Sequence, residues 1–236
     1  GDRRDPNYSF GTNPCSEIIL RDAEFCNLTE VVVRPEDTPA TLAEKVELAS
    51  ILGTWQATLT HFRYLSKTWK KNCEEERLLG VSITGIYDCP YLMRCSPSEL
   101  QWLRDYAVET NDIWSGELGI NQSTAITCVK PSGTVSQLAS CSSGIHPAYN
   151  RYFIRRVRND KKDPLAQVMI DSGILYEEDK SNQEAWVFSF PMSANGKTRK
   201  EVGPIQQLEM WKKFALNWCE HKPSMTCYVP ENMWPQ

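Results

Sequence analysis

Asn13-Pro14-Cys15-Ser16-Glu17 stands near the start of the chain, and Cys26 follows eleven positions after Cys15. Residues two positions apart share a face of an extended segment, so Asn13, Cys15 and Glu17 can reach one bound molecule. Pro14 and a loop tip would distort that alternation. The pattern gathers an amide, a thiol and a carboxylate, which suits chemistry on a small polar substrate.

The carboxylate beside Cys15 indicates the kind of thiol chemistry to expect. A negative charge raises the pKa of a nearby thiol, and no histidine is close in sequence to act as its base, which argues against a protease-type thiolate. A neutral thiol suits hydrogen-atom transfer, with Glu17 as general base on a substrate hydroxyl and Asn13 bound to the same group. Cys26 would supply electrons as half of a dithiol. On spacing alone, the alternative of two cysteines without a chemical role stays open.

A second group of small residues lies at a strand-to-helix turn. The turn contains Pro131, Ser132, Gly133, Thr134, Val135 and Ser136. Free backbone N–H groups at a helix start attract anions, Gly133 permits close approach, and the serine and threonine hydroxyls can donate as well. The turn is therefore a candidate phosphate site, with an ordinary helix cap as the alternative.

The composition excludes several classes of protein. Hydrophobic residues make up 41% of the 236 residues, and the formal net charge of −4 gives no general nucleic-acid footprint. The apolar runs are too short for a transmembrane helix. The nine cysteines include no Cys-x-x-Cys pair, so we expect reduced thiols in a cytoplasmic protein. His61 and His221 lack metal-ligand company, so we expect no metal site, and we expect His146, in a Gly-Ile-His-Pro turn, to be structural.

The periodicity predicts alternating strands and helices, which favours an α/β fold built from parallel units. Strand patterns cover 25–33, 78–87, 123–129, 149–157, 185–190 and 224–229. Helix patterns cover 41–71, 97–118, 163–172 and 204–220. No linker divides the chain, so we expect one domain or part of one.

Several motifs, taken together and in order, resemble the catalytic subunit of ribonucleotide reductases. The similarity is greatest to the monomeric, adenosylcobalamin-dependent (class II) ribonucleoside-triphosphate reductases. The segments that carry it are 11–20, 25–28, 79–86, 130–136, 142–149 and 218–224.

The resemblance implies a role for each residue of both groups. Cys15 would be the thiyl-radical cysteine that takes the 3′ hydrogen of the ribose, Glu17 would remove the 3′-hydroxyl proton, and Asn13 would bind the ribose hydroxyls. Cys26 would be one of two cysteines oxidised to a disulfide as the 2′ carbon is reduced. The turn from Pro131 to Ser136 would bind the substrate phosphates.

The resemblance also implies the fold, a ten-stranded α/β barrel with a central finger loop. This sequence would supply the finger loop (11–24) and the second half-barrel (25–236), while the N-terminal half-barrel is absent. We therefore expect activity together with complementary reductase chains, which would bring the first half-barrel and the second redox cysteine.

The implied cofactor is adenosylcobalamin, and the implied partners are a ribonucleotide substrate and a thioredoxin-like reductant. No nucleic acid or membrane is expected as a direct partner. Triphosphate and diphosphate substrates both remain open. Two further hypotheses also remain: another radical enzyme of the same barrel, of the glycyl-radical type, and a non-catalytic thiol-rich subunit.

Overall fold

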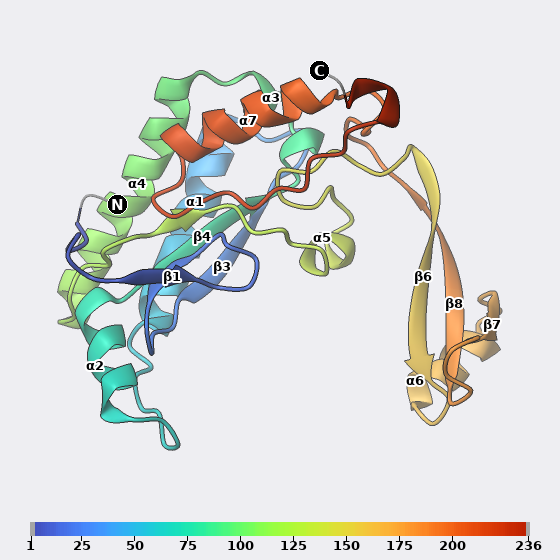
Figure 1. Ribbon diagram of the computed structural model, residues 1–236, viewed down its shortest axis with the longest axis horizontal. Helices are drawn as coiled ribbons and strands as arrows, with labels where there is room; N and C mark the ends of the chain where they lie inside the picture. The colour runs from blue at the N-terminus through green and yellow to red at the C-terminus, as the bar shows by residue number, and fades with distance from the viewer. Residues whose placement is uncertain (1–2, 235–236) are drawn as a thin grey trace.

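The computed structural model describes residues 3–234, so the last two positions of the predicted half-barrel range, 25–236, lie outside the described residues. A parallel sheet in the order β3–β4–β5 forms the centre of the body (Figure 1). Its strands are β3 (Asn27–Val32), β4 (Leu79–Thr84) and β5 (Thr127–Cys128). All six residues of β4 are buried, because strands lie on both sides of it and helices cover one face.

Helices α1 and α4 pack against each other, and α1 also packs on β3 and β4. The helices of the body are α1 (Pro39–Gln56), α2 (Lys67–Glu76), α3 (Pro90–Arg94), α4 (Pro97–Leu118), α5 (Val135–Leu138) and α7 (Pro204–Asn217), with 3₁₀ turns η1 (Ile86–Asp88) and η2 (Glu231–Met233). The predicted limits of α4 are confirmed: a Ser96–Glu99 capping box begins it, and Gly119, with φ 64°, ends it.

The single long helix predicted over 41–71 is wrong. Helix α1 ends at Gln56, an irregular segment follows, and α2 begins at Lys67. Arg77 donates to the carbonyl of Ala57 at 2.6 Å and so satisfies the end of α1. The apolar spacing continues past this point, but Leu59 is 71% exposed. An apolar stripe that does not pack against the core cannot stabilise a helix in this segment.

Two of the predicted strands are also shorter than expected or missing. In 123–129, Asn111 and Glu220 side chains accept from the backbone N–H groups of Ser123 and Ile126, which leaves β5 as two residues. Residues 224–229 form no strand. An isolated β-bridge joins Val129 to Pro223, the residue just before this segment. The N–H groups of Ser123 and Ile126 therefore bond to side chains instead of a sheet ladder.

An antiparallel hairpin near the N-terminus carries the Cys15 motif. It consists of β1 (Phe10–Thr12) and β2 (Ile19–Arg21), with Thr12 opposite Ile19. Figure 1 shows this hairpin beside the end of the central sheet.

A second antiparallel unit projects from the body as an arm (Figure 1). It contains β6 (Tyr152–Asp160), α6 (Pro164–Asp171), β7 (Tyr176–Glu178) and β8 (Ala185–Ser193), with strand order β6–β8–β7. Exposure alternates along β6, so its two faces have different surroundings.

The observed α/β content and the parallel β3–β4–β5 sheet agree with the predicted fold class. The ten-stranded barrel and the central position of the hairpin remain expectations, because the residues described contain one three-stranded parallel sheet. None of the helices within residues 3–234 combines the length and the apolar character that crossing a membrane requires.

Candidate active site

The tip of the β1–β2 hairpin is closed by Asn13. Its backbone N–H donates to the carbonyl of Ile18 at 3.2 Å, and its side-chain Oδ1 accepts from the Ile18 N–H at 3.1 Å. Ser16 adopts φ 61°, which breaks the extended alternation that the sequence suggested. As a result Cys15 is exposed, whereas Glu17 turns inward and is 3% exposed.

Glu17 is buried with one carboxylate oxygen unsatisfied. Its backbone carbonyl accepts from the Lys222 N–H at 3.0 Å, but Oε2 has no hydrogen-bond partner in the described part of the chain. A buried acceptor without a donor costs free energy, so such an atom suits a donor that arrives with a ligand.

Cys26 lies half-buried just before β3, on the face of the sheet that Glu30 also occupies. Burial raises the pKa of its thiol well above the ordinary value, and the carboxylates of Glu24 and Glu17 raise it further. The thiol is therefore neutral at physiological pH. Gly80 makes room for it: a Cβ there would lie 3.3 Å from Cys26 Sγ and 3.1 Å from Ile18 Cδ1.

A further thiol, Cys128, lies near Cys26, and Cys219 lies near Cys128 in turn. Burial raises the pKa of Cys128 well above its ordinary value, and the nearby groups Cys26, Cys219 and Glu17 add to the effect. Burial likewise raises the pKa of Cys219. All nine cysteines are free thiols.

His221 connects the hairpin to the central sheet, a role that sequence reading missed. Its Nε2 lies 2.9 Å from the Leu79 carbonyl and Nδ1 accepts from the Ile19 N–H at 3.3 Å. Burial lowers the pKa of His221 to about 3, so the ring is neutral, with the proton on Nε2. The signal available in the sequence was weak, because both bonding partners of the ring lie far from His221 in the chain, 142 and 202 positions away.

An ion cluster lies under the same hairpin. Arg4 pairs with Glu76 and also donates to the Ile19 carbonyl at 2.7 Å. Arg21 Nη2 lies 3.2 Å from Glu76. Burial and, after it, the neighbouring Glu76 raise the pKa of Glu24 to about 8, so Glu24 is largely protonated at neutral pH.

The predicted phosphate turn differs from expectation in its hydroxyls. Ser132 is buried and donates to Glu30, and Ser136 is buried with its Oγ 2.8 Å from the Ser143 hydroxyl. These two hydroxyls are therefore used inside the protein. Gly133 and Thr134 are exposed, and a Cβ on Gly133 would meet open space. The hydrogen-bond donors that the turn can offer to a ligand are therefore those of the exposed residues Gly133 and Thr134.

Glu30 holds the turn on the sheet. Its Oε1 accepts from the Ser82 hydroxyl at 3.1 Å and from Ser132, and its Oε2 lies 3.1 Å from Lys130 Nζ. Because Cys26 and Glu30 are four positions apart, they share a face at a separation of about 13 Å along the strand direction. The structure thus brings both predicted groups of residues to one face.

Comparison with known proteins gives relatives over nearly the whole chain. An adenosylcobalamin-dependent ribonucleoside-triphosphate reductase of Levilactobacillus brevis is 28% identical over 94% of this chain and 34% of its own length. That of Lactobacillus gasseri is 31% identical over 87% of this chain and 31% of its own length. A crystal structure of a B12-dependent (class II) ribonucleotide reductase superposes with a TM-score of 0.76, at 27% identity, over 92% of this chain and 35% of that one.

The chain is homologous to the adenosylcobalamin-dependent ribonucleotide reductases. It spans about a third of the length of these reductase relatives. The structure of the Actinobacillus ureae class Id ribonucleotide reductase alpha subunit also superposes, with a TM-score of 0.54 and 15% sequence identity. The match covers 89% of this chain and 46% of that subunit, and it shows a shared fold alone. No family model matches the chain.

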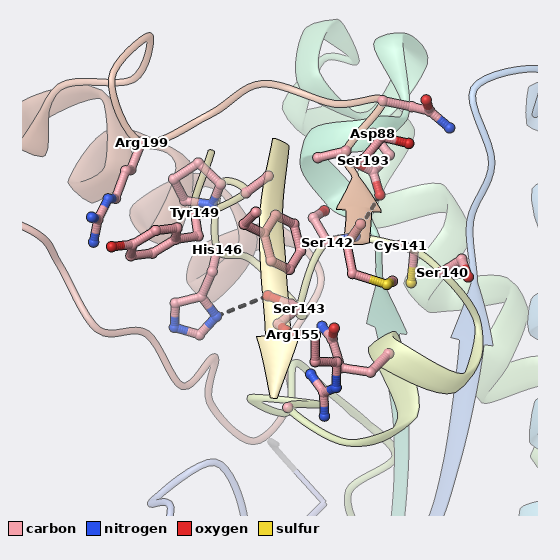
Figure 2. Close-up of a pocket in the computed structure, with 18 of the residues that line it drawn as sticks. Asp88, Ser140, Cys141, Ser142, Ser143, His146, Tyr149, Arg155, Ser193 and Arg199 are labelled. Carbon is pink, nitrogen blue, oxygen red and sulfur yellow. Dashed lines mark hydrogen bonds between the residues drawn. The ribbon is translucent and has the colours of Figure 1, made fainter. Parts of the chain in front are cut away.

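A cavity of about 520 Å³ adjoins the turn at Pro131 and Gly133. Pro131 and Gly133 line it, and so do residues at the root of the arm, among them Arg155 and Ser193 (Figure 2). His146, predicted to be structural, bridges its wall: Nδ1 lies 2.8 Å from the Ser143 carbonyl and Nε2 accepts from the Thr226 N–H at 2.9 Å. Sequence reading did not find this cavity, because its walls come from segments far apart in the chain.

Proposed function

We propose that this chain is the part of a ribonucleotide reductase that carries the radical cysteine, one redox cysteine and the phosphate-binding turn. The observation that carries the proposal is the β1–β2 hairpin, which exposes Cys15 at its tip while Glu17 lies buried with Oε2 unpaired. The names of the reductase relatives support the same reaction.

Each residue then has a defined task. Cys15 takes the 3′ hydrogen atom of the ribose, and Glu17 Oε2, which lacks a donor, accepts the proton of the 3′-hydroxyl. Asn13 Oδ1 is engaged in closing the hairpin, so we assign the ribose contact to its amide N–H groups.

The reduction needs two electrons and two protons. As the 2′-hydroxyl leaves as water, the Cys26 thiol and a second thiol form a disulfide, and Cys15 afterwards returns its hydrogen to C3′. We assign the second thiol to the remaining two thirds of the reductase, on whichever polypeptide they lie. A thioredoxin-like dithiol then reduces the disulfide.

The position of Cys15 fits a cofactor that generates radicals, because the thiol is exposed at a hairpin tip and is accessible from outside. In the relatives that cofactor is named adenosylcobalamin, and radical generation at Cys15 would come from it. Cys15 is the residue of this chain that would face it. The hairpin, residues 11–24, corresponds to the finger loop, and the rest to the second half of the barrel.

Reduction of a ribonucleotide by the assembled reductase tests the proposal, with Cys15→Ser and a control, Cys227→Ser, which changes a half-buried thiol. Cys15→Ser is expected to abolish turnover with an unchanged circular dichroism spectrum, and Cys227→Ser to keep it. Turnover by Cys15→Ser would overturn the proposal. Adding adenosylcobalamin should give an electron paramagnetic resonance signal in the wild type, whereas a glycyl-radical enzyme would give none with this cofactor.

A further inference from the structure

Glu24 is a buried carboxyl group two positions before Cys26, with 4% of the residue exposed. Phe25, which lies between the two, turns outward and packs on Phe62 and Trp69. This alternation is that of an extended segment, in which side chains two positions apart lie on one side and their Cα atoms are at most about 7 Å apart. Glu24 and Cys26 therefore point into the same region of the protein.

The two carboxyl groups of Glu24 and Glu76 together hold one proton. Glu24 Oε2 accepts from the Arg21 backbone N–H at 2.8 Å and lies 3.5 Å from Arg4 Nη2. Oε1 accepts no hydrogen bond within residues 3–234, as expected of an oxygen that carries the proton. Burial and, after it, Glu76 raise the pKa of Glu24 to about 8. Burial opposes the ionisation of Glu76 as well, but the bond from Arg4 outweighs it and lowers that pKa. At neutral pH the proton therefore lies on Glu24.

The Cys26 sulfur is a poor leaving group when a disulfide is broken. Burial and, after it, the charge of Glu24 raise the pKa of its thiol; Glu17 also raises it, and Lys130 lowers it. A disulfide breaks when a thiolate attacks one sulfur and the other leaves with the electron pair, and a sulfur whose thiol has a high pKa leaves slowly. Full reduction of a disulfide that contains Cys26 releases this sulfur once, whichever sulfur is attacked first. A proton delivered to it would speed that step.

The other ionisable groups around Glu24 come from the N-terminal segment, β2 and α2. Within residues 3–234 they are Arg4, Arg21, Glu76 and Cys73. A guanidinium is not deprotonated in proteins. Cys73 Sγ accepts from the Phe25 N–H at 3.3 Å, and burial raises the pKa of this thiol, so it stays protonated. Glu24 is therefore the group of this cluster whose charge changes near pH 8.

We propose that Glu24 is the proton donor to the Cys26 sulfur each time a disulfide of Cys26 is reduced. This inference rests on the proposed function and adds a residue to its re-reduction step. An external dithiol breaks the S–S bond, the Cys26 sulfur leaves with the electron pair, and the proton of the Glu24 carboxyl moves to Sγ. The dithiol is oxidised to a disulfide and releases its protons to water, and the Glu24 carboxylate takes one proton back from water.

Reduction of a mixed disulfide on Cys26 tests this without the reductase reaction. Methyl methanethiosulfonate forms a methyl disulfide on Cys26, dithiothreitol attacks the outer sulfur, and peptide mass spectrometry follows the return of the Cys26 thiol. The wild-type rate, divided by the concentration of dithiothreitol thiolate, should fall as pH rises through about 8, because Glu24 ionises there. Glu24→Gln should be about 100-fold slower and independent of pH. Glu24→Asp should keep part of the rate and its pH dependence. The control Glu75→Gln, at a side chain 40% exposed, should match the wild type.

Turnover of the assembled reductase separates this role from a structural one. The first turnover uses thiols that are already reduced, whereas later turnovers need re-reduction by a dithiol. Glu24→Gln should keep the first turnover and slow the later ones about 100-fold.

Three outcomes would overturn the inference: equal rates of Cys26 release in Glu24→Gln and wild type, a wild-type rate that does not fall near pH 8, or an equal loss of first and later turnovers. Should Glu24→Gln fail to fold, the wild-type pH profile and Glu24→Asp give the decision. If the reductase reaction itself is not found, the mixed-disulfide measurement still reports on Glu24.

Discussion

Lys130 Nζ lies 3.1 Å from Glu30 Oε2, and this ion pair joins residues 100 positions apart. The side chains are 20% and 8% exposed, so the pair is largely shielded from water. Glu30 also accepts from Ser132, whose backbone has φ 52°, an unfavourable conformation for a residue other than glycine. The pair therefore holds the turn in a shape that it would not adopt alone.

Glu30→Gln should lower both stability and nucleotide affinity. The amide keeps an acceptor for Ser132 but leaves Lys130 without its counter-charge, at an expected cost of about 1–3 kcal/mol. Urea unfolding measures the stability change, and equilibrium binding of CTP should weaken by roughly tenfold. The control Glu36→Gln changes an exposed carboxylate and should leave both values unchanged. Normal CTP affinity in Glu30→Gln would contradict the positioning role.

Gly80→Ala should disturb Cys26 and the hairpin together. The new Cβ would overlap Leu28 and lie within 3.3 Å of Cys26 Sγ, so the neighbours must move, at an expected cost of about 1–3 kcal/mol. Thermal unfolding measures this cost, and reaction of Cys26 with a thiol reagent reports its displacement. Gly116→Ala is the matched control, because its Cβ meets open space within a helix and should stabilise by roughly 1 kcal/mol. Equal effects of the two substitutions would refute the packing argument.

His221 should make the protein less stable in mild acid. Burial holds its folded pKa at about 3, below the ordinary 6.5, so below pH 6.5 the unfolded chain binds the proton more readily. The contribution of His221 is complete above pH 6.5, and about 1.4 kcal/mol is lost per pH unit as pH falls toward 3. Urea unfolding at pH 7, 6 and 5 should show this loss in the wild type and in His61→Gln, an exposed control, and a smaller loss in His221→Gln. Parallel curves for all three proteins would exclude this effect.

Glu24 should act in the opposite direction. Burial raises its folded pKa to about 8, above the ordinary 4.5, so its contribution is complete below pH 4.5 and is lost as pH rises through 8. Glu24→Gln cannot ionise, and its melting temperature relative to wild type should rise between pH 5 and pH 8. Glu75→Gln, which changes a side chain 40% exposed, should show no such trend. A constant difference between Glu24→Gln and wild type across this range would show that Glu24 does not titrate in it.

Local sequence patterns predicted the elements whose ends and faces are decided by neighbouring residues. The capping box at Ser96 and the glycine at 119 determine α4 directly, since each acts within one helical turn. The helix over 41–71 failed because periodicity does not report whether a core covers the apolar stripe. The strand over 224–229 failed because its backbone forms no continuous ladder: the Ser224 N–H bonds to the Val129 carbonyl, whereas the Thr226 N–H bonds to the His146 ring.

The sequence alone determined the chemistry available here: a thiol beside a carboxylate, a second thiol after it, and a turn of small residues. Only the tertiary structure decided which of these groups face outward and what holds them. It exposed Cys15, buried Glu17, engaged Ser132 with Glu30 and joined His221 to a hairpin about 200 positions earlier in the chain. Such contacts depend on how the whole chain closes on itself, and residues so distant leave no periodic signal in the sequence.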